Sequence, residues 1–156
     1  MAQQSGILYL SKSGRRSRLN RPGPSEFMYG TIELIRQGLD ISLIEDVDIG
    51  LDALKNRSFW GILNFAFYKL FGIPLWMLKV FSGRQIRQTL NGFETILVTT
   101  NSFGISLGIL KKFGLLQPSV VFIAMGLLEK TTKRHIVWIY RWIFRNIHIC
   151  ALSQPE

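Results

Sequence analysis

The sequence has one cysteine, Cys150, and only two histidines, His135 and His148. A single cysteine excludes an internal disulfide framework and a zinc site built from thiolates of this chain. The histidines stand without carboxylates or thiols at metal-ligand spacing, so we expect no metal site. The first apolar run, "GILYL", is too short for a signal peptide and precedes its charges instead of following them. These features predict a reducing, cytoplasmic setting.

Carboxylates are scarce over most of the chain, and the formal net charge is +9. Residues 1–24 hold five bases and no acid, whereas residues 25–52 hold seven acids against one base. Residues 53–156 hold thirteen bases against three acids. Such a basic surface attracts phosphates, whether these belong to nucleic acid, a nucleotide or an anionic lipid. Composition alone does not choose among these partners.

Short apolar runs alternate with amphipathic stretches along the chain. This alternation predicts one Rossmann-like α/β domain over residues 1–156, with a parallel sheet flanked by helices and an additional hydrophobic helical crossover over residues 51–92. The expected strands are residues 6–10, 41–45, 93–100, 119–124 and 149–152. In such a sheet, ligands bind at the carboxyl ends of the strands.

The loop after the first strand is rich in Arg, Ser, Gly and Pro. Ser25 is a plausible N-cap for the helix that follows, Gly30 would let that helix pack closely on a strand, and Gly38 stands where it should stop. A helix that starts there offers free N–H groups to a phosphate. Taken alone, however, "PGPSE" also fits an ordinary loop and cap. Asn101 or Ser102 is the expected cap of a later helix.

The order of these parts resembles the N-terminal glycine-loop region of GT-B glycosyltransferases of the group 1 (family 4) type. Gly23, Ser25, Glu26, Gly38 and Asp40 fall on the pattern of that region. The stretch "TTNSFGISLGILKKFGLLQPSVVFIAMGL" is similar to the family's strand, acceptor-side helix and next strand, and "ICALSQPE" is similar to its "ALS-x-x-E" stretch.

The resemblance implies half of a two-domain enzyme. The chain corresponds to the N-terminal, acceptor-side half, and the C-terminal donor domain would be supplied in cis or as a separate subunit. The complete enzyme would use a nucleotide-sugar donor, with no cofactor bound by this domain alone. Met125 replaces the histidine that often contacts the donor sugar, so no catalytic residue is assigned and the isolated chain is expected to be inactive.

The resemblance also implies two groups of binding residues. Gly23 and Ser25 would contact the donor diphosphate. The residues that would face the acceptor are Arg15, Arg16, Arg18, Thr100, Asn101 and Ser102. For the arginines, a solvated basic loop is the alternative reading.

Residues 59–81 are long and apolar enough to cross a bilayer, with only Lys69 and Lys79 as charges. Pro74 and Asn64 argue against a spanning helix, and two helices broken near residues 72–74 fit better. The aromatic side chains of this segment suit an interfacial surface: Trp60, Phe65, Phe67, Phe71 and Trp76. The alternative is a crossover buried against the sheet or against the missing domain.

The helix expected at residues 134–147 has two different faces. Its core stripe is Ile136, Ile139, Tyr140, Ile143 and Ile147, and its opposite face carries Arg134, Trp138, Arg141 and Arg145. That basic and aromatic face suits anionic headgroups. Interleaved Arg and Trp also serve nucleic acid, but no nucleic-acid-binding fold accompanies them, so nucleic acid is the disfavoured partner.

Two hypotheses follow. The first is a glycosyltransferase half, cytoplasmic and peripheral on the inner face of the cell membrane, that acts on a lipid-linked or cell-envelope glycan acceptor. The second is a non-catalytic, membrane-associated binding module that recruits a separate donor-domain subunit.

Overall fold

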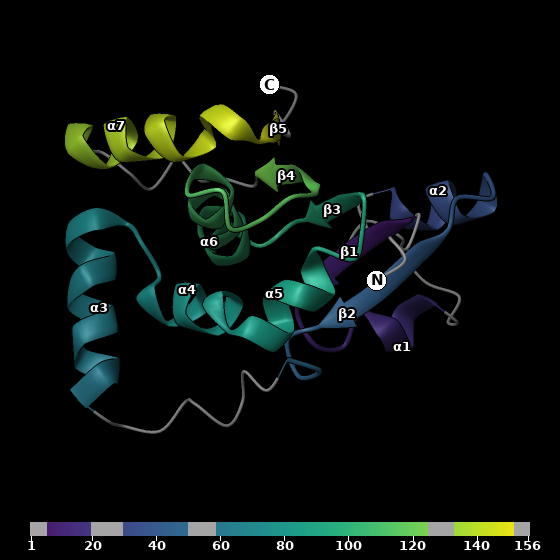
Figure 1. Ribbon diagram of the computed structural model, residues 1–156, viewed down its shortest axis with the longest axis horizontal. Helices are drawn as coiled ribbons and strands as arrows, with labels where there is room; N and C mark the ends of the chain where they lie inside the picture. The colour runs from purple at the N-terminus through teal and green to yellow at the C-terminus, as the bar shows by residue number, and fades with distance from the viewer. Residues whose placement is uncertain (1–5, 20–29, 50–58, 125–132, 152–156) are drawn as a thin grey trace.

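The computed structural model describes residues 6–19, 30–49, 59–124 and 133–151 (Figure 1). The strands are β1 (Ile7–Ser11), β2 (Ile41–Glu45), β3 (Thr95–Val98), β4 (Ser119–Ala124) and β5 (His148–Ala151). The helices are α1 (Arg16–Leu19), α2 (Thr31–Arg36), α3 (Phe59–Phe71), α4 (Leu75–Ser82), α5 (Arg84–Leu90), α6 (Asn101–Lys112) and α7 (Arg134–Ile143), with a 3-10 turn η3 (Phe144–Asn146).

The five strands form one parallel sheet in the order β2-β1-β3-β4-β5. Ile7 pairs with Ile41 on one side and with Thr95 on the other, and Ser11 pairs with Glu45 at the carboxyl end. Parallel pairing requires crossover connections, which the helices supply. The predicted fold class, a Rossmann-like parallel sheet flanked by helices, is confirmed.

The sheet buries apolar side chains on both faces, because successive residues of a strand point to opposite sides. On one face the sheet packs against α4, α6 and η3; the core there includes Leu8, Leu10, Phe81, Ile96, Val98, Phe103, Leu107 and Phe122. On the other face Tyr9, Leu97 and Ile123 form a smaller cluster, against which Ile32 of α2 packs. Continuous apolar strands therefore reflect burial on two sides.

Helix α6 is the most enclosed helix of the described chain, since every residue from 103 to 110 is buried. Its close contact with β4 depends on Gly104, where a Cβ atom would lie 2.6 Å from the Phe122 ring. The N-cap of α6 is Thr100, which precedes both expected caps, Asn101 and Ser102, and its side chain makes no capping hydrogen bond. Phe103, Leu107 and Leu110 of this helix are buried in the core.

The start predicted for α2 is wrong. The helix begins at Thr31, and its N-cap is Gly30 with φ 80°, a left-handed conformation through which an α-helix does not continue. The predicted cap, Ser25, lies outside the described residues. The expected close packing at Gly30 is also wrong, since a Cβ atom there would meet nothing within 4 Å. The predicted stop is confirmed, because α2 ends at Arg36 and Gly38 has φ 85°.

The hydrophobic crossover contains α3, α4 and α5, and residues 51–58 of its predicted range lie outside the described part. The expected break occurs at Gly72, which has φ 70°. The Tyr140 hydroxyl of α7 donates a hydrogen bond of 2.9 Å to the Gly72 carbonyl. Figure 1 shows α3 at the periphery of the molecule, standing apart from the sheet.

Helix α7 lies against α6 and carries the two predicted faces. Of the predicted core stripe, Ile136, Tyr140, Ile143 and Ile147 are buried and Ile139 is half-buried. Arg134, Trp138, Arg141 and Arg145 are exposed on the opposite side. The α-helix is shorter than expected, because η3 replaces its last turn before β5.

Candidate functional site

The carboxyl edge of the sheet is where the fold places a ligand. In the strand order, β2 pairs with one edge of β1, whereas β3 pairs with the other edge of β1. The strand order therefore reverses direction at β1. Ligands of such sheets bind beside this reversal, outside the carboxyl ends of the strands. Here the loops that follow Ser11, Glu45 and Val98 form that edge.

The loops after β1 and β2 are joined by hydrogen bonds. The Ser13 N–H donates to Asp46 Oδ1 at 2.6 Å, and the Arg16 N–H donates to Glu45 Oε1 at 2.6 Å. The Asp46 N–H donates to the Ser11 carbonyl at 3.1 Å. Because Arg16 is the first residue of α1, the Glu45 carboxylate accepts from a free N–H of that helix.

The Arg16 side chain is held by β2 and by the loop that follows it. Its Nη2 donates to Asp48 Oδ2 at 2.6 Å and to the Leu43 carbonyl at 3.0 Å. The pKa of Asp48 is lowered, first by the hydrogen bond from the Glu45 N–H and then by the Arg16 side chain. The Arg16 side chain therefore points toward β2, and the Asp48 carboxylate partly neutralises its charge.

The polar residues after β3 lie on the other side of β1. Thr99 is buried, whereas Thr100, Asn101 and Ser102 are half-buried around the first turn of α6. No acid lies in that turn, so its N–H groups and hydroxyls are not opposed by a carboxylate of the same helix. The Ser106 hydroxyl donates to the Ser102 carbonyl at 2.8 Å, which ties the first turn of α6 to the next.

The structure brings only part of the predicted binding set together. Thr100, Asn101 and Ser102 form one group at β3, while Arg16 belongs to the group at β2. Arg15 is half-buried beside Arg16. The side chain of Arg18 lies outside the described part, as do the predicted diphosphate contacts Gly23 and Ser25.

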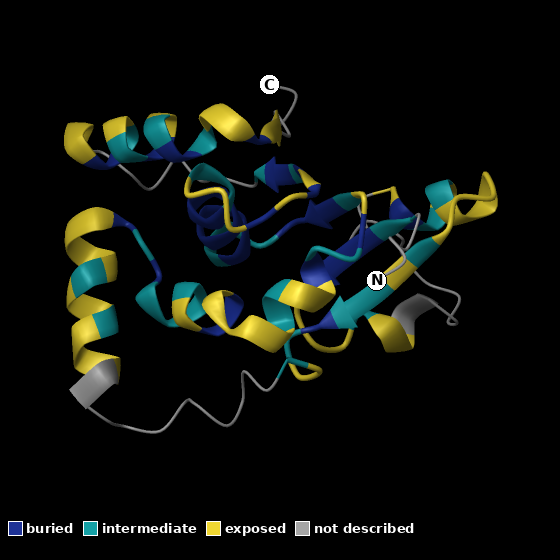
Figure 2. Cartoon of the chain, viewed as in Figure 1, coloured by how far each residue is buried: buried dark blue, intermediate teal, exposed yellow. Residues whose placement is uncertain are grey.

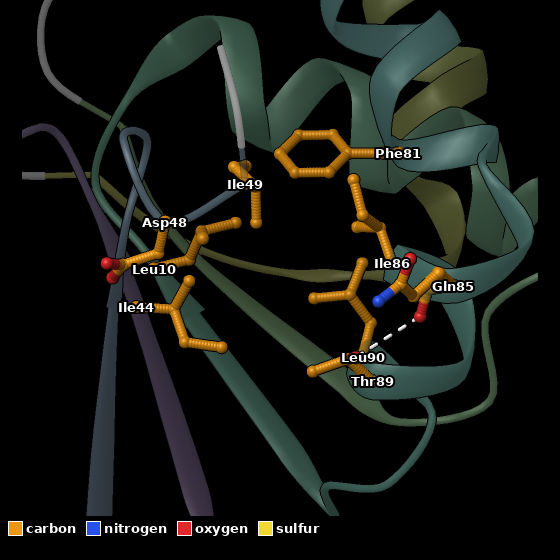
Figure 3. A pocket seen from close by; sticks show the side chains of 9 residues that line it. All are labelled: Leu10, Ile44, Asp48, Ile49, Phe81, Gln85, Ile86, Thr89 and Leu90. Carbon is orange, nitrogen blue, oxygen red and sulfur yellow. Dashed lines mark hydrogen bonds between the residues drawn. The ribbon is translucent and has the colours of Figure 1, made fainter.

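A pocket of about 330 Å³ lies between the β1–β2 end of the sheet and helices α4 and α5. Its lining is Leu10, Ile44, Asp48, Ile49, Phe81, Gln85, Ile86, Thr89 and Leu90. Figure 3 shows Ile49 and Phe81 facing each other at one end, with the Asp48 carboxylate directed away from the apolar side chains. The Thr89 hydroxyl donates to the Gln85 carbonyl at 3.1 Å.

Sequence reasoning missed this pocket. Ile86 and Leu90 stand four residues apart, which is the local signal of an inward helix face. Nothing local, however, places that face opposite Ile44 and Ile49, which come from a segment about forty residues earlier.

The aromatic residues predicted for a membrane surface occupy different environments. Phe65 and Phe71 are exposed, while Phe67 is half-buried, and the centroids of the Phe67 and Phe71 rings lie 4.6 Å apart. Trp76 packs against the main core. The side chain of Trp60 lies outside the described part. Exposed residues that were not predicted are Ile62, Leu63, Tyr68 and Leu70.

Two further findings concern metal binding and membrane spanning. Within the described ranges, no group of three or more His, Cys, Asp and Glu side chains is arranged to hold a metal ion. Among the described helices, none is by itself long and apolar enough to span a bilayer; α3 and α4 reach that length and hydropathy only together, and they are bent by 111° at their break.

The sheet and its loops define a Rossmann-like α/β domain with a polar carboxyl edge. No protein-family model matches the chain, and neither a curated protein nor a solved structure matches it.

Proposed function

We propose that the chain is the acceptor-side half of a GT-B-type glycosyltransferase. With a donor domain supplied in cis or by a separate subunit, it transfers a sugar from a nucleotide-sugar to a lipid-linked or cell-envelope glycan acceptor. The reaction takes place at the cytoplasmic face of the membrane. The observation that carries this proposal is the polar carboxyl edge of a parallel sheet, with hydroxyl and amide side chains at the start of α6 and arginines in the neighbouring loop.

The residues at this edge suit a glycan that carries phosphate. Hydroxyl and amide groups such as those of Thr100, Asn101 and Ser102 both donate to and accept from sugar hydroxyls. A guanidinium such as that of Arg15 pairs with a phosphate. Arg16 acts as a positioning residue, because its bonds to Asp48 and Leu43 fix the loop after β1. In this proposal Gly23 and Ser25 contact the donor diphosphate in the completed enzyme.

A second candidate is a non-catalytic, membrane-associated module that recruits a donor-domain subunit. The observation that favours it is the set of large apolar side chains exposed on α3, a helix whose residues are largely exposed (Figure 2). The DNA sequence that follows the codon for Glu156 in the gene distinguishes the two candidate functions. A continued reading frame with a paired-glutamate motif favours an enzyme half, whereas a stop codon favours the module.

Binding of a glycolipid tests the acceptor edge directly. The probe is an isoprenoid-diphosphate glycolipid in detergent micelles, titrated into the chain with tryptophan fluorescence as the readout. We expect Arg15→Gln with Ser102→Ala to weaken binding about tenfold or more, since a hydrogen bond to a charged group contributes about 1.5 to 3 kcal/mol.

The matched control is Arg36→Gln with Ser119→Ala. Both residues are exposed, Arg36 at the end of α2 that leads into the amino end of β2 and Ser119 at the amino end of β4, opposite the carboxyl edge. The control should bind as the unaltered chain does. Equal binding by all three proteins would remove the carboxyl edge from acceptor recognition.

A further inference from the structure

Helix α3 carries large apolar side chains on its outer side. Ile62 is 72% exposed, Phe65 is 62% exposed and Leu70 is 56% exposed. Ile62 and Phe65 are three residues apart, and Ala66 and Lys69 continue the same side of the helix with the spacing of neighbours on a helix surface. Single exposed apolar residues are common, but a contiguous stripe marks an interaction surface. Figure 2 shows exposed residues along much of α3.

The other side of α3 is fixed to the domain. Asn64 Oδ1 accepts a 2.9 Å hydrogen bond from the Trp76 N–H of α4. Asn64 and Phe67 are the half-buried residues among 61–71. At the end of the helix, the Gly72 carbonyl accepts from Tyr140. These contacts determine which side of α3 faces outward.

Cations gather at the carboxyl end of α3. Lys69 Nζ lies 5.3 Å from the centroid of the Phe65 ring. Lys133 Nζ donates to the Lys69 carbonyl at 3.2 Å, and His135 Nε2 lies 2.8 Å from the Leu70 carbonyl. Arg134, between them, is exposed. The sequence has no carboxylate in residues 59–93 or 133–155, so nothing in these stretches opposes this charge.

We propose that this surface, formed by Ile62, Phe65 and Leu70 with the cations Lys69, Lys133 and Arg134, docks the protein on an anionic lipid bilayer. Helix α3 lies in the plane of the interface, with its apolar side chains below the headgroups and its cations at the lipid phosphates. The Lys69 stem runs along apolar surface while its ammonium group reaches the phosphates. The proposal specifies the membrane contact of the proposed function, and it does not depend on sugar transfer.

Charge and shape favour a bilayer over a protein partner. The stripe lies on one convex helix, and the pocket found among the described residues lies elsewhere, beside α5. A convex apolar helix with cations at one end matches an acyl layer below a plane of phosphates. The 111° bend between α3 and α4 keeps α3 from continuing as a spanning helix.

The main test is sedimentation with vesicles that contain neither sugar donor nor acceptor. We expect the full chain to bind vesicles of equal parts phosphatidylglycerol and phosphatidylcholine, and to bind less as salt rises. Ile62→Ser with Phe65→Ser should reduce partitioning at least about tenfold, because both side chains lose burial in the acyl layer. Phe113→Ser with Leu115→Ser is the matched control, since both residues are exposed in the loop after α6. The control should bind as the unaltered chain does.

Charge variants test whether the cations at the end of α3 contact the lipid phosphates. Lys69→Gln with Arg134→Gln should weaken binding to the anionic vesicles several-fold and reduce the salt dependence. Binding to pure phosphatidylcholine should not change. Trp138→Ser tests the basic and aromatic face of α7. If it releases the chain while the Ile62 and Phe65 variant stays bound, the docking surface lies on α7 and the proposal fails.

An environment-sensitive label makes the test independent of whether the serine variants fold. In a Cys150→Ser background, a nitrobenzoxadiazole label at Phe65→Cys should shift to shorter wavelength when anionic vesicles are added. The same label at Phe113→Cys should not shift. Absence of a shift at position 65, or of vesicle binding by the unaltered chain, overturns the proposal and leaves α3 as a surface for a protein partner. A chain that binds vesicles but fails to bind glycolipid contradicts the proposed acceptor function alone.

Discussion

Gly72 and Tyr140 join two segments that lie far apart in the sequence. Gly72 ends α3 with a left-handed backbone, and its carbonyl accepts from the buried Tyr140 hydroxyl. There is no space for a side chain at this position, because a Cβ atom would meet Tyr140 Oη and would lie 2.9 Å from Ile136 Cγ2. One residue therefore satisfies a backbone requirement and a packing requirement at once.

Gly72→Ala should destabilise the fold by about 1 to 3 kcal/mol, since it adds backbone strain and overpacking at one point. Urea unfolding measures the change. Gly14→Ala is the control, because Gly14 also has a positive φ, of 88°, but open space around its Cβ position. A loss of stability equal in the two variants would show that strain alone matters and that the contact with α7 does not.

Tyr140 should make stability depend on pH in the alkaline range. Burial, with a smaller contribution from Tyr68, raises the pKa of Tyr140 to about 12, from 10.0. Because the folded-state pKa is the higher one, this contribution is fully present below pH 10.0 and is lost as the pH rises toward about 12. Tyr140→Phe should lower stability by about 1 kcal/mol at neutral pH, through the lost hydrogen bond to Gly72.

The difference between Tyr140→Phe and the unaltered chain should shrink as the pH rises from 10.0 toward about 12. Urea unfolding at several pH values measures this. Tyr68→Phe should keep most of the pH dependence, because burial of Tyr140 is the larger cause. A difference that stays constant over this range would mean that the Tyr140 hydroxyl is not selectively protonated in the folded state.

At the scale of elements, the strands were the easiest to predict. "ISLIE" and "SVVFIA" are apolar runs bounded by turn residues, and these local signals give the bounds of β2 and β4. The start of α2 was missed because Ser25 has the side chain of a typical N-cap, whereas the left-handed backbone of Gly30 determines where the helix begins. A local cap signal does not reveal such a conformation.

The candidate site was harder to predict than the sheet. The pairing of Arg16 with Asp48 joins residues 32 positions apart, so the neutralised charge exists only in the folded chain. Helix α3 is apolar on nearly all sides, and periodicity therefore does not show which side faces outward. The contact between Asn64 and Trp76 decides this, and it depends on the angle between two helices.

Two glycines in helices should respond to alanine in opposite directions. Gly104→Ala should destabilise by about 1 to 3 kcal/mol, because the added Cβ would push α6 away from the Phe122 ring. Gly61→Ala should stabilise α3 by about 0.5 to 1 kcal/mol, because a Cβ at Gly61 meets nothing within 4 Å and alanine favours the helix. Thermal unfolding checks both. Stabilisation by Gly104→Ala would contradict the close contact between α6 and β4.

At the scale of the whole molecule, the sheet and α3 present different surfaces. The carboxyl edge of the sheet offers hydroxyl, amide and guanidinium groups, whereas α3 offers apolar side chains with cations at one end. The proposed function assigns the acceptor to the first surface, and the proposed docking surface assigns the membrane to the second.

The isolated chain should transfer no sugar, because the proposed function places the nucleotide-sugar site in a second domain. Radiolabelled nucleotide-sugars incubated with the chain and a lipid-linked glycan should leave no label in the lipid fraction. The positive control is the same mixture with a completed two-domain enzyme. Turnover by the 156-residue chain alone would contradict the proposal that it is only the acceptor half.

The hydrogen bond between Tyr140 and Gly72 affects how far the carboxyl edge of the sheet can lie from a membrane bound by α3. A flexible tether would let the sheet sample many heights above a bilayer, but α3 is joined to α7 and α4 by fixed contacts. In the proposed docked state, these contacts would hold the carboxyl edge of the sheet at one height and one tilt above the bilayer. Under the proposed function, acceptors whose reacting sugar projects to that height would then be selected over those that end nearer to or farther from the lipid.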